Sequence, residues 1–151
     1  MKKVFFSGLI ALVLSAGPAG CGFDDDDDLD PRIERANQEG IIVITVTAGE
    51  DLQKPVYTWS FEEDITAGLL SVAAVDDPGN PGWEITSTQD LISSPVIHGI
   101  TPDGVSVPHS ALLALDLDVW YRVTVSKNSI PGSSSSSDFC LIGSGCPAHP
   151  G

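Results

Sequence analysis

The chain has 151 residues, of which 42% are hydrophobic and 19% are charged, and its formal net charge is −14 at pH 7. This length has room for one ordinary domain rather than two. Because so anionic a chain is repelled by phosphate backbones and by anionic lipid headgroups, the composition argues against nucleic-acid binding.

Residues 1–20 have the pattern of a secretory signal peptide. Lys2 and Lys3 precede an apolar run over residues 4–15. That run is too short for a bilayer span of ~20 residues, but it has the length of a signal-peptide core of ~7–15 residues. Removal of residues 1–20 would leave five basic and 21 acidic residues, so the mature chain would carry a formal charge of −16.

Small residues then lead to a cysteine, in the order Pro18-Ala19-Gly20-Cys21. This ending resembles the lipobox of bacterial lipoproteins, in which a small pair such as Ala-Gly precedes the modified cysteine. The resemblance implies lipidation of Cys21 and a firm attachment to a membrane through its acyl chains. Gly22 follows the cysteine, which in the enteric sorting pattern implies the outer membrane. Pro18 stands where the family usually has Leu, so an ordinary secretory signal remains the alternative.

Residues 21–38 are expected to form a disordered acidic tether. Five consecutive aspartates, Asp24 to Asp28, would repel one another and keep the segment extended in solvent. The alternative is a calcium site, since hard cations bind clustered carboxylates. A contiguous run cannot place all its carboxylates around one ion, so a solvated spacer is the favoured interpretation. Early acidic residues also resemble, in composition, the export signals of some surface lipoproteins.

Runs of β-branched and aromatic residues follow, separated by turn-forming residues, and they predict an all-β domain over residues 39–142. The expected strands cover residues 41–47, 56–60, 68–75, 83–86, 95–100, 119–127 and 139–142. About seven short strands without a convincing helical period predict an antiparallel β-sandwich. In the strongest strand the inward face is expected to carry the alternating residues Val119, Tyr121, Val123 and Val125.

The segment around the strongest strand resembles the corner before the sixth strand of fibronectin type III domains. There a Leu lies six residues before a Tyr that begins alternating valines, and Leu115 and Tyr121 have that spacing. The resemblance implies that the Tyr121 hydroxyl binds the loop backbone and that Trp59 is the core tryptophan of the second strand. It covers roughly residues 38–142. The usual Pro-Gly of the corner is replaced by Leu117-Asp118, so an immunoglobulin-like sandwich of another topology stays open.

The C-terminal part contains a serine-rich segment and two cysteines. Residues 128–138 include five consecutive serines and are expected to form a mobile loop, and residues 143–151 are expected to form a tail. If Cys21 is lipidated, Cys140 and Cys146 remain as a pair, and an oxidising envelope would favour a disulfide between them. Zinc is the rival ligand, with His149 nearby, although the usual paired spacing is absent.

No motif points to catalysis, and no cofactor is expected. His98 alternates with Val96 and is expected to face solvent or to lie at an edge with its hydrogen bonds satisfied, while His109 is expected in a loop. The turn Glu62-Glu63-Asp64 could hold a cation, but a solvated loop is the simpler interpretation. Trp83 and Trp120, if exposed, would be interface candidates. A core position is the favoured expectation for both.

These patterns together predict a non-enzymatic, membrane-anchored extracytoplasmic module with a binding or structural role. The expected partner is a protein or glycan of the cell envelope. The alternatives are an accessory subunit of an envelope enzyme, a glycan-binding module, and a calcium-responsive lipoprotein.

Overall fold

A computed structural model describes residues 32–35, 42–61 and 64–151 of the chain. Every regular element within these residues is a β-strand, and every paired strand runs antiparallel to its neighbour. This finding confirms the expected all-β class with antiparallel sheets.

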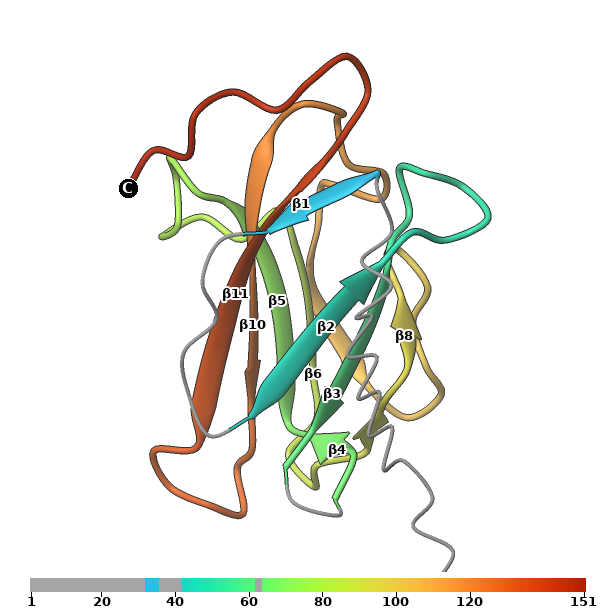
Figure 1. Cartoon of the computed structure of the whole chain (residues 1–151). Helices are drawn as coiled ribbons and strands as arrows, with labels where there is room; N and C mark the ends of the chain where they lie inside the picture. The colour runs from blue at the N-terminus through green and yellow to red at the C-terminus, as the bar shows by residue number, and fades with distance from the viewer. Residues whose placement is uncertain (1–31, 36–41, 62–63) are drawn as a thin grey trace, which may run out of the picture.

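The larger sheet has six strands in the order β1-β11-β10-β5-β6-β9 (Figure 1). Its strands are β1 (Ile33–Arg35), β5 (Leu69–Ala74), β6 (Trp83–Thr86), β9 (Ser106–Ser110), β10 (Trp120–Ser126) and β11 (Ser134–Leu141). The centre of the sheet is formed by β10, which pairs with β11 on one side and with β5 on the other. The strongest strand of the sequence therefore occupies the best-protected position in the sheet.

The smaller sheet has three strands in the order β2-β3-β8. Its strands are β2 (Val43–Thr47), β3 (Val56–Ser60) and β8 (Val96–Ile97). A short separate pair, β4 (Thr66–Ala67) and β7 (Ile92–Ser93), joins the loops at one end. The two main sheets lie face to face with their strands inclined to each other (Figure 1), which is the arrangement of a β-sandwich.

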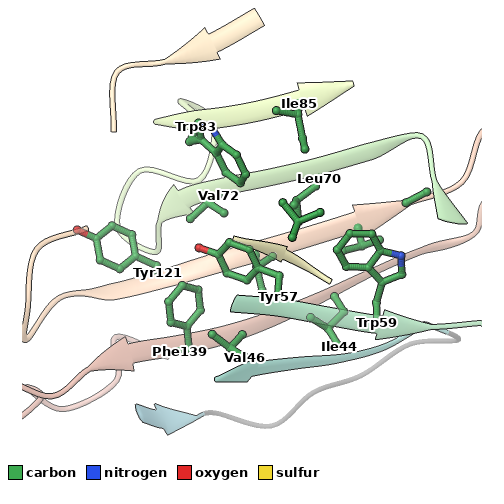
Figure 2. Packing of buried hydrophobic residues seen from close by; sticks show 14 of the residues in the cluster. Ile44, Val46, Tyr57, Trp59, Leu70, Val72, Trp83, Ile85, Tyr121 and Phe139 are labelled. Atoms are coloured by element: carbon green, nitrogen blue, oxygen red, sulfur yellow. The ribbon is translucent and has the colours of Figure 1, made fainter. Parts of the chain in front are cut away.

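The core is formed by inward side chains from both sheets. Figure 2 shows Tyr57 and Trp59 of the smaller sheet facing Val72 and Leu70 of the larger one. These four side chains are at most 2% exposed. Burial of a large apolar side chain contributes about 1.5–3 kcal/mol, so this shared layer is what joins the two sheets.

Several sequence expectations are confirmed at the level of single strands. The strands expected at residues 56–60 and 83–86 coincide with β3 and β6. The inward face of β10 carries Tyr121, Val123 and Val125, which are all buried, while Val119 lies just before the strand and is half-buried. Period-two alternation therefore identified the buried face correctly.

The structure of the serine-rich segment differs from the sequence expectation. Residues 128–138 were expected to form a mobile loop, but Ser134–Ser137 belong to β11 and pair with β10 residue by residue. Ser135 is buried, and its hydroxyl accepts a hydrogen bond of 2.9 Å from the Ile42 amide. Strand pairing overrides the weak β-propensity of serine here, because the neighbouring strand β10 binds the backbone.

The strand expected at residues 95–100 is much shorter in the structure. Only Val96 and Ile97 form β8, because the chain turns back at Gly99, and the Ile100 amide donates to the Ile97 carbonyl. Gly99 has a φ of 75°, and a Cβ atom there would lie 2.5 Å from the Leu113 carbonyl oxygen. Both the left-handed backbone and the lack of space require glycine at this turn.

Four strands were not expected from the sequence, namely the short pair β4 and β7 and the two edge strands β1 and β9. β1 lies within the segment assigned to the acidic tether, and its residues Ile33–Arg35 pair with Leu141, Cys140 and Phe139 of β11. Pairing with the sandwich thus begins before the expected boundary at residue 39. β9 forms the other edge of the larger sheet, and all five of its residues are exposed. β9 therefore lacks the alternation of a half-buried strand.

Candidate functional site

Residues 143–150, termed the strap, are held across one end of the sandwich. Cys140 and Cys146 are joined by a disulfide with an S–S distance of 2.06 Å, so neither sulfur is available as a thiolate for zinc. Figure 1 shows this C-terminal segment passing over the end of the larger sheet toward the loop between β5 and β6. The expected tail is therefore packed against the domain.

The carboxylate of Asp118 binds the beginning of the strap. It accepts hydrogen bonds from the backbone amides of Gly143 (2.7 Å), Ser144 (2.8 Å) and Gly145 (3.0 Å), and from the Ser144 hydroxyl (2.7 Å). These bonds, led by those from Ser144, hold the pKa of Asp118 well below its usual range. Asp118 itself has a φ of 59°, which an aspartate tolerates better than most residues do.

The end of the strap lies on the side chain of Trp120. The Trp120 indole Nε1–H donates to the Pro147 carbonyl at 2.8 Å, and the His149 ring meets the indole edge-on at a centroid distance of 4.7 Å. His149 Nε2 also lies 2.9 Å from Asp138 Oδ2. Trp120 is consequently only 7% exposed, so it is buried, as the favoured expectation had it, and it is not an exposed interface residue.

Asp138 links the strap to the outer face of the larger sheet. Arg122 binds it through two parallel bonds of 2.6 Å, from Nε to Oδ1 and from Nη2 to Oδ2. Burial acts to raise the pKa of Asp138, but the hydrogen bonds from Arg122 and His149 outweigh it and lower that pKa. Bidentate pairing of this kind fixes the orientation of both groups.

A pocket of about 240 Å³ lies between the strap and the end of the sandwich. We call it the strap pocket. It is lined by Val75, Asp76, Asp118, Val119, Trp120, Pro147, Ala148 and Pro150. Its lining includes two carboxylates, one indole and several apolar side chains, and no basic residue.

The outer face of the smaller sheet carries no charged side chain. We call it the small-sheet face, and it consists of Val43, Thr45, Thr47, Val56, Thr58, Ser60 and Ile97. Strand register places Thr47, Val56 and Ile97 in one row across the sheet. Val43 is 60% exposed and Ile97 is 42% exposed. An uncharged face is unusual on a chain with 21 acidic residues.

A second pocket, of about 440 Å³, opens at one end of the small-sheet face. We call it the Ile97 pocket. It is lined by Ala48, Gly49, Glu50, Asp51, Lys54, Val56, Ile97 and Ile100. Ile100 is 53% exposed, and its pocket lies between the β2–β3 loop and the turn after β8. Charged groups of this pocket come only from the β2–β3 loop, at its rim.

The position of His98 differs from the expectation that this residue faces solvent. The ring is fully buried, with Nδ1 2.9 Å from the Tyr57 hydroxyl and Nε2 2.9 Å from the Leu112 carbonyl oxygen. Burial lowers the pKa of His98 to about 4. The expectation of satisfied hydrogen bonds is correct, but His98 belongs to the core, beside Trp83. His109 lies on β9 and not in a loop.

The residues of the expected tyrosine corner lie close together. The Tyr121 hydroxyl accepts a hydrogen bond of 3.0 Å from the Asp116 amide, and Leu115 is fully buried. Trp59 is 2% exposed and lies on β3 in the core, as Trp83 does on β6. Burial is the main cause of the raised pKa of Tyr121.

Some expected site residues fall outside the part of the chain that the structure describes. These are Cys21, the aspartates Asp24 to Asp28, and Glu62 and Glu63. Asp64, the remaining residue of the acidic turn, forms a salt bridge with Lys127, whose side chain is 3% exposed. Among the described residues, no three His, Cys, Asp or Glu side chains are arranged to hold a metal ion.

Sequence reasoning missed the small-sheet face and both pockets. The signal for the face was present, since residues 43, 45, 47, 56, 58 and 60 alternate with core residues and none is charged. The pockets have no such signal, because each is assembled from loops that are far apart in the sequence.

The chain matches no protein-family model, and neither curated proteins nor solved structures include one that is similar to it. None of the described segments forms a helix with the length and apolar character needed to cross a membrane.

Proposed function

We propose that this protein is a lipid-anchored binding module of the bacterial cell envelope, whose small-sheet face contacts another envelope protein. The anchor rests on the lipobox-like ending at Cys21 and on the signal-peptide pattern before it. Acyl chains at Cys21 would hold the domain at a membrane, with the outer membrane favoured by Gly22. Intact-mass measurement of the membrane fraction tests the anchor, which requires a mature chain that begins at acylated Cys21.

The observation that carries the binding role is the uncharged small-sheet face with the Ile97 pocket at its end. Single exposed apolar residues are ordinary on protein surfaces, but Val56, Ile97 and Ile100 lie together in one pocket. The centres of protein interfaces are depleted of charged residues, because a buried charge must be desolvated. A partner could cover the seven residues of this face without burying a charged side chain, since charged residues line only the Ile97 pocket at its end.

The partner that fits this surface is a protein that presents an aliphatic or aromatic side chain. The Ile97 pocket has a volume of about 440 Å³ and mostly apolar walls, so it accommodates such a side chain as an anchor. Thr47 lies in the same row as Val56 and Ile97, and Thr45, Thr58 and Ser60 lie farther along the face, so their hydroxyls can form hydrogen bonds with the partner around the anchor.

We also propose that the sandwich is of the fibronectin type III or immunoglobulin-like kind. The bond from the Asp116 amide to the Tyr121 hydroxyl is the contact that a tyrosine corner makes. The pairing order supports the same assignment, since β2-β3-β8 faces a sheet in which β11, β10 and β5 are consecutive neighbours. This corresponds to strands A, B and E opposite strands G, F and C of that architecture.

Site-specific photo-crosslinking in intact cells tests the binding role. A photoreactive residue replaces Ile100, which is 53% exposed beside the Ile97 pocket, and in a matched chain it replaces Leu91, which is 50% exposed elsewhere. We expect one discrete adduct with an envelope protein from position 100 and none from position 91. Adducts of equal yield at both positions, or at neither, would contradict the proposal.

A further inference from the structure

The strap pocket combines apolar walls with negative charge and contains no basic group. Its volume of about 240 Å³ is below the ~300–1,000 Å³ of typical small-molecule sites, so a single side chain suits it better than a cofactor does. Val75, Val119 and Pro150 provide apolar contact area, and Trp120 provides an aromatic ring.

The negative charge of the strap pocket comes from Asp76 and Asp118. Asp76 is exposed and forms no salt bridge with any residue that the structure describes. Asp118 stays ionised because the strap donates its hydrogen bonds to the carboxylate form. Its charge is therefore fixed at the pocket wall.

We propose that the strap pocket binds a lysine side chain on a basic segment of a partner protein. The four methylene groups of lysine match the apolar walls, while its ammonium group matches Asp76 and the ring of Trp120. Both oxygens of Asp118 already accept bonds from the strap, so Asp76 is the pocket carboxylate that is left to pair with the ammonium group. The ammonium group acts as a point charge and does not need two free oxygens on one carboxylate.

This site is independent of the partner that the small-sheet face binds. The strap pocket is lined by β5–β6 loop residues, the start of β10 and the strap, and it shares no lining residue with the Ile97 pocket. Either site can therefore fail a test without affecting the conclusion about the other.

Nuclear magnetic resonance of the full chain in detergent micelles tests the lysine site. The probe is the pentapeptide Gly-Ser-Lys-Ser-Gly, and the matched control replaces its lysine by norleucine, which has a similar length and no charge. The readout is the indole N–H signal of Trp120, assigned by its loss in Trp120→Phe. We expect the lysine peptide to shift this signal in a saturable manner, and the norleucine peptide to shift it at least tenfold less at equal concentration.

Two charge-removing variants complete the test. Asp76→Asn removes the pocket carboxylate that has no partner, and Asp103→Asn removes an exposed carboxylate that does not line the pocket. Asp76→Asn should weaken lysine-peptide binding at least threefold, while Asp103→Asn should leave it unchanged. The proposal is overturned by equal shifts from both peptides, by no shift with the lysine peptide, or by equal weakening in both variants.

Discussion

The Tyr57 hydroxyl donates a hydrogen bond to Nδ1 of His98, with an O–N distance of 2.9 Å in the centre of the core. The direction of this bond follows from the other ring nitrogen. His98 Nε2 lies 2.9 Å from the Leu112 carbonyl oxygen, which can only accept, so Nε2 carries the proton of the neutral ring. His98 therefore joins β3 to the loop after β9, and it does so in the uncharged state.

Acidification should destabilise the domain through His98. Its pKa is about 4 in the folded chain and about 6.5 when the ring is solvated, so between these values the unfolded chain binds a proton that the native chain does not. The free energy of unfolding should be highest above about pH 6.5 and should fall by about 3 kcal/mol as the pH drops to about 4. Urea unfolding followed at several pH values measures this slope.

Two variants separate His98 from other titrating groups. His98→Gln should flatten the slope between pH 6.5 and 4.5, even though the variant is less stable at every pH. His109→Gln should retain the slope, because His109 is exposed on β9. The carboxylates with lowered pKa, Asp64 and Asp118, contribute stability that is lost only below about pH 4. An unchanged slope in His98→Gln would rule out the assignment.

Gly99→Ala should destabilise the chain more than Gly104→Ala. Both glycines have left-handed backbones, with φ values of 75° and 79°, and alanine in that region costs about 1–2 kcal/mol. At Gly99 alone, the added Cβ would also lie 2.5 Å from the Leu113 carbonyl oxygen, while nothing lies within 4 Å at Gly104. Chemical denaturation should show the larger loss for Gly99→Ala, and equal losses would mean that the turn relaxes freely.

Tyr121→Phe should lower the free energy of unfolding by about 1 kcal/mol, because the Asp116 amide loses its acceptor at a partly buried position. Tyr57→Phe is the comparison. It leaves Nδ1 of the fully buried His98 without its donor, so it should cost more, about 1–3 kcal/mol. Both are measured by urea unfolding at pH 7. A neutral Tyr121→Phe would show that the corner contact does not stabilise the loop.

Asp118→Ala should loosen the strap. The amides of Gly143, Ser144 and Gly145 all donate to this carboxylate, so their hydrogen exchange should accelerate together in the variant. Exchange in β10 and β5 should stay slow, since those strands pair in the centre of the larger sheet. Asp116→Ala is the matched control, because its carboxylate does not bind the strap. Unchanged exchange at residues 143–145 in Asp118→Ala would contradict the role assigned to that carboxylate.

The fold class could be predicted from the sequence because buried and less buried residues alternate along the central strands. Val123 and Val125 alternate with half-buried polar residues on β10, and Tyr57 and Trp59 alternate with less buried residues on β3. The failures have a common cause, which is tertiary pairing. The serines of β11 form a strand because β10 binds their backbone, and nothing in a run of identical polar residues reveals that pairing.

The candidate sites were harder to predict than the core. His98 was expected to face outward, but residues two apart on a strand share a face, and Val96 and His98 are both buried while Ile97 between them is exposed. Trp120 stands on the outer face of β10, where Pro147 and His149 of the strap contact it. Contacts between segments that are distant in the chain, such as Trp120 with Pro147, have no local sequence pattern.

The central claim is that the small-sheet face contacts an envelope protein, and a charge inserted into that face tests it most directly. The chain with the photoreactive residue at position 100 is compared with the same chain carrying Ile97→Asp. Ile97 is 42% exposed, so the change should leave thermal unfolding of the domain nearly unaffected. The account predicts that the adduct yield falls at least tenfold, because a carboxylate would be desolvated in the interface. An undiminished adduct with the same partner would contradict the claim.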